Sequence, residues 1–357
     1  MSTMDRVLHV IHSGGFYGAE RMLADHCLAL DTTLDSRVAF IAPSQELQER
    51  FSAMGIACET IGTLAELVRI VERHSSQVVN AHNFKAQLYA WQAARRCKRP
   101  LVFTQHGFTP RNLKQRLYMY SSILLCKTPV VSHVVCVAGS IVRQHETLHV
   151  PERKLSLIAN GLPVRQVRPR QVFQPLIGFI GRLSREKGPD LFLRAVIPLL
   201  QQRPEVQAVM LGDGPMRGGL QVEINRQGLA GRVTLAGYQN DIDEWLSRLS
   251  VLVISSRTEG TPMILLEGMH AGVPVAAFAV GGIPDVVRHD QEGLLAAAED
   301  CSALEQNIGC LLDEPRLADS LCRQAYLRQK ERFSLHNNIR LWQALYTRLL
   351  GAQASCG

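Results

Sequence analysis

The chain has 357 residues, a length that suits two domains of ordinary size. Hydrophobic residues make up 46% and charged residues 20%, a normal globular balance, and the formal net charge is +7. Nine scattered cysteines without a C-x-x-C pair disfavour a zinc ribbon and a disulfide framework and indicate a reduced, cytoplasmic compartment. We expect neither a secretory signal nor a membrane-spanning helix, because no apolar run is long enough.

Short apolar runs alternate with helix-length segments along the whole chain. Runs without polar alternation are typical of parallel strands buried on both faces, with helices as the crossovers between them. Each half is therefore predicted to be α/β, an open doubly wound sheet of the Rossmann-like kind. The expected strands are residues 7–11, 38–42, 78–81, 101–104, 133–137 and 155–159, then 176–180, 206–211, 233–236, 251–254 and 274–278.

The boundary between the halves is expected in residues 162–175, LPVRQVRPRQVFQP, which are rich in Pro, Arg and Gln. We therefore expect domains at 1–165 and 166–335. Residues 336–357 follow as a terminal amphipathic helix, because the apolar residues of 335–350 recur at helical spacing. Two doubly wound domains in tandem are expected to face across a cleft at the carboxyl ends of their sheets, where ligands bind in such folds.

The positive charge is concentrated in the first half. Residues 1–165 hold 19 basic and 12 acidic side chains, whereas residues 166–357 hold 20 of each. A soluble surface that happens to be basic explains this, and so does a face that meets anionic lipid or an anionic acceptor. Nucleic acid ranks lower, because no nucleic-acid motif is present. Between Glu72 and Glu146 no acid occurs among eleven basic residues: Arg73, Lys85, Arg95, Arg96, Lys98, Arg99, Arg111, Lys114, Arg116, Lys127 and Arg143.

A pair of carboxylates, Glu259 and Glu267, stands around the turn Gly260-Thr261-Pro262. An apolar strand precedes the pair and another follows it, so one acid is expected at a strand exit and the other on the next helix. Pro262 suits the first helical turn, where a missing N–H costs little. The unpaired N–H groups of a helix start favour an anion. A phosphate flanked by two carboxylates that bind hydroxyls is the ligand this pattern indicates.

Two further loops carry candidate phosphate ligands. Arg182 and Lys187 follow a predicted strand and precede a helix. The planar guanidinium of Arg182 and the ammonium of Lys187 are therefore placed where they can hold a diphosphate. Two solvated loop cations are the alternative. Gly14 and Gly15 follow the first strand and allow a phosphate to approach the backbone, although a plain tight turn fits equally.

His106 is expected at the carboxyl end of a strand, where a histidine is more often functional than elsewhere. Two motifs that look metal-binding are better explained otherwise, so no metal site is predicted. The HETLH of residues 145–149 runs directly into Val150-Pro151 and lacks a nearby third ligand. Asp241 and Asp243 open a helix, where an acid is a common cap.

The chain resembles the retaining nucleotide-sugar glycosyltransferases of the GT-B fold, glycosyltransferase family 4. The motifs that carry this resemblance are the E-x7-E pair at 259–267, GR…KG at 181–188, AGVPVAA…GGIPDVV at 271–287, ANGL at 159–162, GGFYGAE at 14–20 and TQHG at 104–107. His270 departs from the family's small-residue pattern after the second glutamate. The resemblance covers nearly the whole chain and specifies fold and activity class better than the sugar.

The resemblance implies a role for each matching position. Arg182 and Lys187 would hold the donor's diphosphate, and Glu267 would bind the ribose hydroxyls. Glu259 would contact the donor sugar, with Gly260, Thr261 and Pro262 beside it. Gly14 and Gly15 would approach phosphates or acceptor from the first domain, and His106 would face the reacting sugar. The first domain would take a glycan or lipid-linked acceptor, with no metal or other cofactor required, and the final helix would return to it.

Two other functions remain open. A nucleotide-sugar epimerase of similar fold would need acids and bases around the sugar's C2, and a non-catalytic partner would only bind nucleotide sugar or membrane. The sequence is silent on the donor's base and sugar, the acceptor, the linkage, the pathway and the oligomeric state. If the basic first domain meets a membrane, the protein would be peripheral on its inner face.

Overall fold

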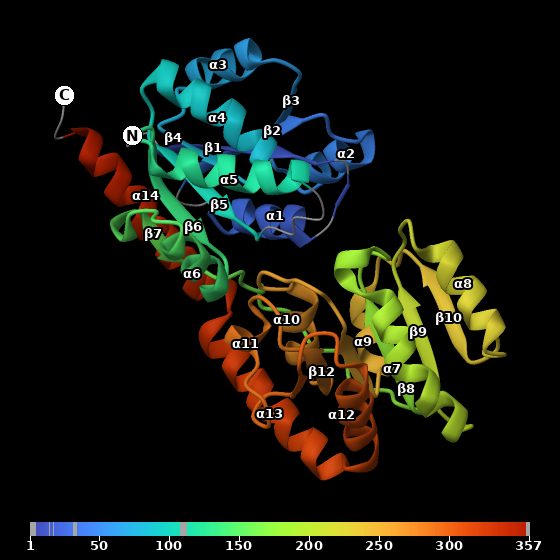
Figure 1. Cartoon of the computed structure of the whole chain (residues 1–357). Helices are drawn as coiled ribbons and strands as arrows, with labels where there is room; N and C mark the ends of the chain where they lie inside the picture. Colours follow the sequence, from blue (N-terminus) through green and yellow to red (C-terminus); the bar gives the residue numbers. More distant parts are fainter. Residues whose placement is uncertain (1–4, 14, 17, 31–33, 108–112, 355–357) are drawn as a thin grey trace. The chain divides into compact units, whose positions relative to one another are not determined.

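The computed structural model describes residues 5–13, 15–16, 18–30, 34–107 and 113–354 (Figure 1). The chain forms two compact units. Unit 1 is Met1–Pro163 together with Leu335–Gly357, and unit 2 is Val164–Ser334. Most of the segment expected as a linker, from Val164 onward, therefore belongs to unit 2. No helix in the described residues has the length and apolar character needed to cross a bilayer.

Unit 1 is built on a seven-stranded parallel sheet with the order β3-β2-β1-β4-β5-β6-β7. The order reverses at β1, which lies between β2 and β4. Polar residues at the carboxyl ends of these central strands therefore meet at one edge. The strands are β1 Asp5–His12, β2 Leu34–Ile41, β3 Cys58–Ile61, β4 Val78–Ala81, β5 Leu101–Gln105, β6 Val131–Cys136 and β7 Leu155–Leu157.

Helices cover both faces of this sheet. One face packs against α3, α4 and α5 through residues such as Val79, Leu101 and Phe103. The other face, which includes Val78 and Val102, packs against α14. The helices are α1 Gly18–Leu30, α2 Gln45–Ala53, α3 Leu64–Arg73, α4 Phe84–Cys97, α5 Leu113–Lys127, α6 Gly139–Thr147, the short η1 Glu152–Lys154 and α14 Leu335–Ala354.

Unit 2 is built on a six-stranded parallel sheet with the order β10-β9-β8-β11-β12-β13. Its strands are β8 Leu176–Ile180, β9 Gln207–Leu211, β10 Val233–Gly237, β11 Val251–Ile254, β12 Val275–Phe278 and β13 Leu294–Ala296. Its helices are η2 Arg185–Lys187, α7 Pro189–Gln202, α8 Arg217–Arg226, α9 Ile242–Arg248, α10 Met263–His270, α11 Ile283–Val286, α12 Cys301–Asp313 and α13 Pro315–Arg332.

The two parallel α/β sheets expected from the apolar runs are confirmed, and β4, β8 and β11 have the predicted bounds. The final helix, residues 335–354, packs on unit 1, since Ile339, Trp342 and Tyr346 are buried in its core. Two strands, β3 and β13, were not predicted. Both are short and lie at an edge of their sheet.

Candidate functional site

The loops that follow β8 and β11 lie side by side because these strands are neighbours in unit 2. Gly188 ends the first loop with a φ of +64°, and a Cβ there would lie 2.0 Å from the carbonyl oxygen of Ser255. The Ser255 hydroxyl donates a 2.8 Å hydrogen bond to the carbonyl of Gly188. Only glycine suits this position, and the close approach fixes the two loops against each other.

Lys187 and Glu259 form the centre of the cluster. The ammonium Nζ of Lys187 donates to both carboxylate oxygens of Glu259, at 2.7 Å and 2.9 Å. The Ser256 hydroxyl donates to the same carboxylate at 2.6 Å. The Glu259 side chain is 7% exposed and the Lys187 side chain 33%. The carboxylate is thus anchored inside the protein, while the ammonium reaches solvent and can donate to an arriving anion.

A glycine pair after β12 fixes the backbone of Glu259. Gly281 has a φ of +56°, and a Cβ there would lie 1.9 Å from the carbonyl oxygen of Glu259. The N–H of Gly282 donates to that oxygen at 3.0 Å. These glycines belong to the GGIPDVV segment of the sequence resemblance. In the structure they allow the chain after β12 to approach the backbone of Glu259 closely.

Arg257, which the sequence reasoning missed, ties the two loops together. Its backbone N–H donates to the carbonyl of Glu186 at 2.8 Å, and its Nη1 donates to the carbonyl of Arg185 at 2.8 Å. The guanidinium also binds both carboxylate oxygens of Asp190, at 2.9 Å and 2.7 Å, and lies 3.2 Å from Glu299. Arg257 therefore holds the turn that presents Lys187.

The ion pair between Arg257 and Asp190 shifts the pKa of both groups. Burial opposes ionisation of Asp190, but the hydrogen bonds and charge of Arg257, with backbone N–H groups, outweigh burial and lower the pKa of Asp190. The hydrogen bond to Asp190, which outweighs the opposing effect of burial, raises the pKa of Arg257. Asp190 lies in the first turn of α7, directly after the Lys187 loop. This acid is the feature of the sequence that could have indicated the pair.

Arg182 lies in the same loop as Lys187 and is exposed. The loop is fixed from the side of β9, because the N–H of Leu183 donates to the carbonyl of Asp213 at 2.9 Å. A Cβ at Gly181 would lie 3.9 Å from Cγ of Lys187, so the Lys187 stem runs beside Gly181. The structure thus brings Arg182, Lys187 and Glu259 to the carboxyl ends of β8 and β11.

Glu267 is 4% exposed on α10, and its Oε1 lies 3.5 Å from Nη1 of Arg165. The sequence reasoning missed Arg165, which lies in the segment expected as a linker. His270 holds this segment, because its Nε2 lies 3.1 Å from the carbonyl of Arg165. A Cβ at Gly268 would lie 2.5 Å from Cδ2 of Leu252, so the missing side chain lets α10 pack on β11.

The turn before α10 differs from expectation by one residue. Pro262 is the N-cap and α10 begins at Met263, so the placement of Pro262 inside the first turn is wrong. The Pro262 side chain makes no capping hydrogen bond to the helix. Thr261 is buried and Gly260 is partly exposed just before it. The N–H of Leu265 donates to the carbonyl of Pro262 at 3.2 Å. N–H groups at the start of a helix favour an anion in the loop before it.

In unit 1, His106 follows β5 and is partly exposed. Burial lowers the pKa of His106 to about 4, so its imidazole is neutral near neutral pH. Its Nε2 lies 3.4 Å from Nδ1 of His82, a residue the sequence reasoning did not select. Gly15 lies in a turn closed by the Ser13 hydroxyl, which donates to its carbonyl at 2.9 Å. Gly14 lies outside the described residues.

Both motifs that were rejected as metal sites lie at helix ends. Helix α6 ends at Thr147 and His149 has a φ of +57°, so His149 is not on the helix that carries His145. Asp241 Oδ1 accepts the N–H of Glu244 at 3.0 Å, which confirms the predicted cap of α9. In the described ranges, no group of three or more His, Cys, Asp or Glu side chains is placed to hold a metal ion.

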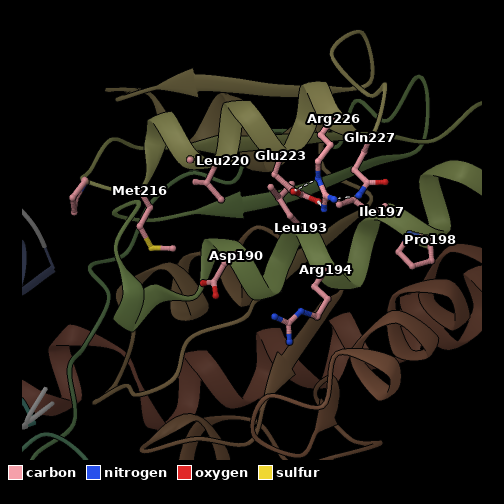
Figure 2. Close-up of a pocket in the computed structure, with 12 residues that line it drawn as sticks. Asp190, Leu193, Arg194, Ile197, Pro198, Met216, Leu220, Glu223, Arg226 and Gln227 are labelled. Atoms are coloured by element: carbon pink, nitrogen blue, oxygen red, sulfur yellow. Dashed lines mark hydrogen bonds and ion pairs between the residues drawn. The ribbon is translucent and has the colours of Figure 1, made fainter.

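A cavity of about 610 Å³ lies between α7 and α8 of unit 2. Figure 2 shows Leu193, Met216 and Leu220 along it, with the ion pair of Glu223 and Arg226 at its rim. Neither Lys187 nor Glu259 lines this cavity. It is a groove between two helices beside the sheet, and it shares Asp190 with the contacts that hold the Lys187 loop.

Two family models match the chain, and together they cover more than half of it. The model described as "Glycosyl transferases group 1" matches residues 174–314, and "Glycosyltransferase Family 4" matches residues 58–166. The D-inositol 3-phosphate glycosyltransferase of Streptomyces scabiei is 28% identical over 67% of this chain and 61% of its own length. The lipopolysaccharide core biosynthesis mannosyltransferase LpsB of Rhizobium meliloti is 32% identical over 49% of this chain and 52% of its own. The chain thus spans about half to three-fifths of these two relatives.

Solved structures share the fold over nearly the whole chain. Anabaena Alr3699/HepE in complex with UDP-glucose has a TM-score of 0.87 at 20% identity, covering 96% of this chain and 99% of that chain. Sucrose-phosphate synthase from Thermosynechococcus elongatus has a TM-score of 0.79 at 16% identity, covering 98% and 100%. The two parallel α/β units are therefore those of the GT-B fold. The chain belongs to the group 1 glycosyltransferases, family 4.

Proposed function

We propose that the chain is a retaining glycosyltransferase. It moves a sugar from a nucleoside diphosphate sugar to a glycan or lipid-linked acceptor, in the synthesis of surface polysaccharide or glycolipid. The observation that carries the proposal is the Lys187 ammonium, held by the buried Glu259 carboxylate at 2.7 Å and 2.9 Å and open to solvent. The relatives named lipopolysaccharide core mannosyltransferases and the HepE complex with UDP-glucose support the acceptor and donor classes.

Sugar transfer from a nucleoside diphosphate needs above all a stabilised leaving group. In the proposal, Arg182, Lys187 and the first-turn N–H groups of α10 take up the negative charge that the diphosphate gains as the bond to C1 breaks. No cofactor is part of this scheme. The acceptor hydroxyl attacks C1 on the face that the diphosphate leaves, which retains the anomeric configuration, and its proton passes to a phosphate oxygen.

The carboxylates have separate tasks in this scheme. Glu259 orients Lys187 and contacts the donor sugar beside Gly260, Thr261 and Pro262. Glu267 accepts hydrogen bonds from the ribose hydroxyls in place of its contact with Arg165. From unit 1, His106 faces the reacting sugar, and Gly14 and Gly15 approach the phosphates or the acceptor.

The test is a transfer assay with UDP-, GDP- and ADP-sugars and a mixed glycan and glycolipid acceptor fraction, followed by analysis of the anomer formed. We expect one donor to give an α-linked product from an α-linked donor, and Lys187→Ala to abolish transfer. Epimerised nucleotide sugar formed without acceptor would establish the epimerase instead. Normal polymer assembly in cells that carry Arg182→Ala/Lys187→Ala would establish a non-catalytic partner.

We infer that α5 of unit 1 meets an anionic membrane from the cytoplasmic side. Leu113, Leu117, Tyr120 and Leu124 are 83%, 63%, 50% and 61% exposed, and their spacing places them along one side of the helix. Arg116 and Lys127 are exposed on the same helix. Exposed apolar side chains beside cations suit the boundary between headgroups and acyl chains.

Vesicles test this second proposal. We expect binding to vesicles that contain anionic lipid, weakened by added salt because the basic residues of the acid-free stretch contribute Coulomb attraction. Of that stretch, Arg111 and the side chain of Lys114 lie outside the described residues. Equal binding to neutral and anionic vesicles would contradict the basic-face argument.

A further inference from the structure

Three histidines form a row on one face of the sheet of unit 1. His9 lies in β1, His82 follows β4 and His106 follows β5. Since β4 lies between β1 and β5, the three side chains come from neighbouring strands. His9 pairs in register with Asn80, and side chains two residues apart point to the same face. His82 therefore continues the face that carries His9 and Asn80.

The ring nitrogens make a chain of hydrogen bonds. Nδ1 of His9 lies 3.0 Å from Nε2 of His82, and Nδ1 of His82 lies 3.4 Å from Nε2 of His106. His9 is 0% and His82 4% exposed, whereas His106 reaches the carboxyl edge of the sheet and is partly exposed. The backbone supports the row, because the N–H of His82 donates to the carbonyl of Val10 at 3.0 Å.

Burial keeps all three rings neutral near neutral pH. It is the main cause that lowers the pKa of His9 and His82, and the neighbouring histidines lower it further. His26 of α1 faces His9 with its ring centroid 5.1 Å away, and burial lowers the pKa of His26 to about 3. Tyr346 of α14 lies 3.5 Å from His26, and burial raises its pKa. His26 and Tyr346, which lie beside the row, are therefore uncharged near neutral pH.

A neutral imidazole carries one N–H and one bare nitrogen, so a chain of three rings runs in one direction. Within the described residues, Nε2 of His9 has no hydrogen-bond partner. A buried N–H without an acceptor is rarer than a buried acceptor without a donor. The bare nitrogen therefore belongs at Nε2 of His9. His9 then donates through Nδ1 to His82, and His82 donates through Nδ1 to His106.

We infer that His9 and His82 are positioning residues that hold His106 as the tautomer protonated on Nδ1. Its Nε2 accepts from His82, which fixes the ring, and its Nδ1–H is the donor that remains for a ligand at the carboxyl edge. Resting on the proposed function, that ligand is a hydroxyl or ring oxygen of the transferred sugar. A neutral donor polarises such an oxygen without adding a positive charge that would attract the diphosphate.

The first test is independent of enzymatic activity. Two-bond ¹H–¹⁵N spectra of the ligand-free protein with ¹⁵N-labelled histidine show which ring nitrogen carries the proton, and single His→Gln variants assign the signals. At neutral pH we expect His106 protonated on Nδ1 and bare on Nε2. In His82→Phe, which removes the donor, we expect a mixture of both tautomers. A proton on Nε2 of His106 in the wild-type protein would overturn the inference.

The second test uses turnover and separates positioning from simple structural support. We expect His106→Ala to lower kcat about a hundredfold, as the loss of one preorganised donor does elsewhere. His82→Phe should lower kcat about tenfold with little change in KM, and His82→Gln should restore part of it, because an amide both donates and accepts. His133→Gln, a buried histidine of β6 outside the row, should leave kcat unchanged.

Together, the tautomer measurement and the turnover measurement distinguish failure of this inference from failure of the proposed function. If the wild-type protein transfers no sugar, the proposed function fails and the tautomer measurement still decides the inference. If transfer is normal and His82→Phe keeps the wild-type kcat, the inference is overturned while the proposed function stands.

Discussion

At the residue scale, the candidate site depends on positions where the backbone comes unusually close to a neighbour. Gly188 and Gly281 have positive φ angles, and a Cβ on either would lie 2.0 Å or 1.9 Å from a carbonyl oxygen of the loop after β11. That loop carries Glu259, and Gly188 directly follows Lys187. The geometry of the Lys187–Glu259 pair therefore rests on two missing side chains.

Replacing Gly188 by alanine should destabilise unit 2 by about 3 kcal/mol, because the new Cβ has no room and the φ is strained. Chemical denaturation followed by fluorescence measures this. The control is Gly218→Ala in α8, where a Cβ meets nothing within 4 Å and helix propensity favours alanine by up to about 1 kcal/mol. Equal stability of Gly188→Ala and wild type would contradict the close packing.

Ionisation of Asp190 should make the free energy of unfolding depend on pH. Its pKa in the folded protein is lowered from the ordinary 3.8, so the ionised form stabilises the fold. That contribution is present above about pH 4 and is lost as pH falls through the lowered pKa. Urea denaturation between about pH 2.5 and pH 6 should show a smaller loss of stability at low pH in Asp190→Asn than in wild type. Identical pH dependence would remove the Arg257–Asp190 pair from the account.

The sequence selected residues that the structure brings together, but it did not indicate the contacts that hold them. Lys187 and Glu259 were selected because their residue types suit a phosphate and a hydroxyl at strand ends. Arg257 was missed because its partners are two backbone carbonyls and Asp190, which only the packing of two loops brings together. His82 was missed for a similar reason: it meets His106 because β4 and β5 are neighbours.

At the scale of the element, α5 presents an apolar stripe to solvent. Leu117→Glu/Leu124→Glu removes two apolar groups and adds two negative charges, each change opposing transfer to an anionic surface. We expect binding to anionic vesicles, measured by co-sedimentation, to fall at least tenfold. Leu157→Glu on β7, also exposed, is the control that should bind like wild type. Unchanged binding of the α5 variant would place the membrane contact elsewhere.

Helix α14 closes the core of unit 1 through a buried hydrogen bond. Asn80 Nδ2 donates to the hydroxyl of Tyr346 at 3.0 Å, and Tyr346 is fully buried. Tyr346→Phe should lower the free energy of unfolding by about 1–3 kcal/mol, because it leaves a buried donor without its acceptor. Tyr120→Phe on the exposed face of α5 should leave stability unchanged. A Tyr346→Phe protein as stable as wild type would show that the buried amide has another partner.

The elements that the sequence predicted well are those buried on both faces. Strands β4, β8 and β11 are central, and their apolar runs end where the strands end. The edge strands β3 and β13 are short, and β3 reads Cys-Glu-Thr-Ile, so it lacks an apolar run. Edge position alone does not explain these misses, because β7 and β10 also end their sheets and their apolar runs were predicted. Strand β13 reads Leu-Leu-Ala, so its apolar run is only three residues long.

At the scale of the whole molecule, each unit gathers its chemistry at the carboxyl ends of its own central strands. In unit 2 the loops after β8, β11 and β12 supply Arg182, Lys187, Glu259 and the glycines that fix them. In unit 1 the ends of β4 and β5 supply His82 and His106. The excess positive charge belongs to the first half of the sequence. In the proposed function, unit 2 binds the donor and unit 1 meets an anionic surface or the acceptor.

The most direct test of this account is calorimetric binding of UDP-, GDP- and ADP-sugars to the wild-type protein, to Lys187→Ala and to Arg332→Ala, an exposed cation of α13. We predict that at least one nucleotide sugar binds the wild-type protein and Arg332→Ala equally. We predict that Lys187→Ala binds it at least about tenfold more weakly, the loss of one charge-assisted contact. Wild-type affinity in Lys187→Ala, or no binding of any nucleotide sugar to the wild-type protein, would contradict the account.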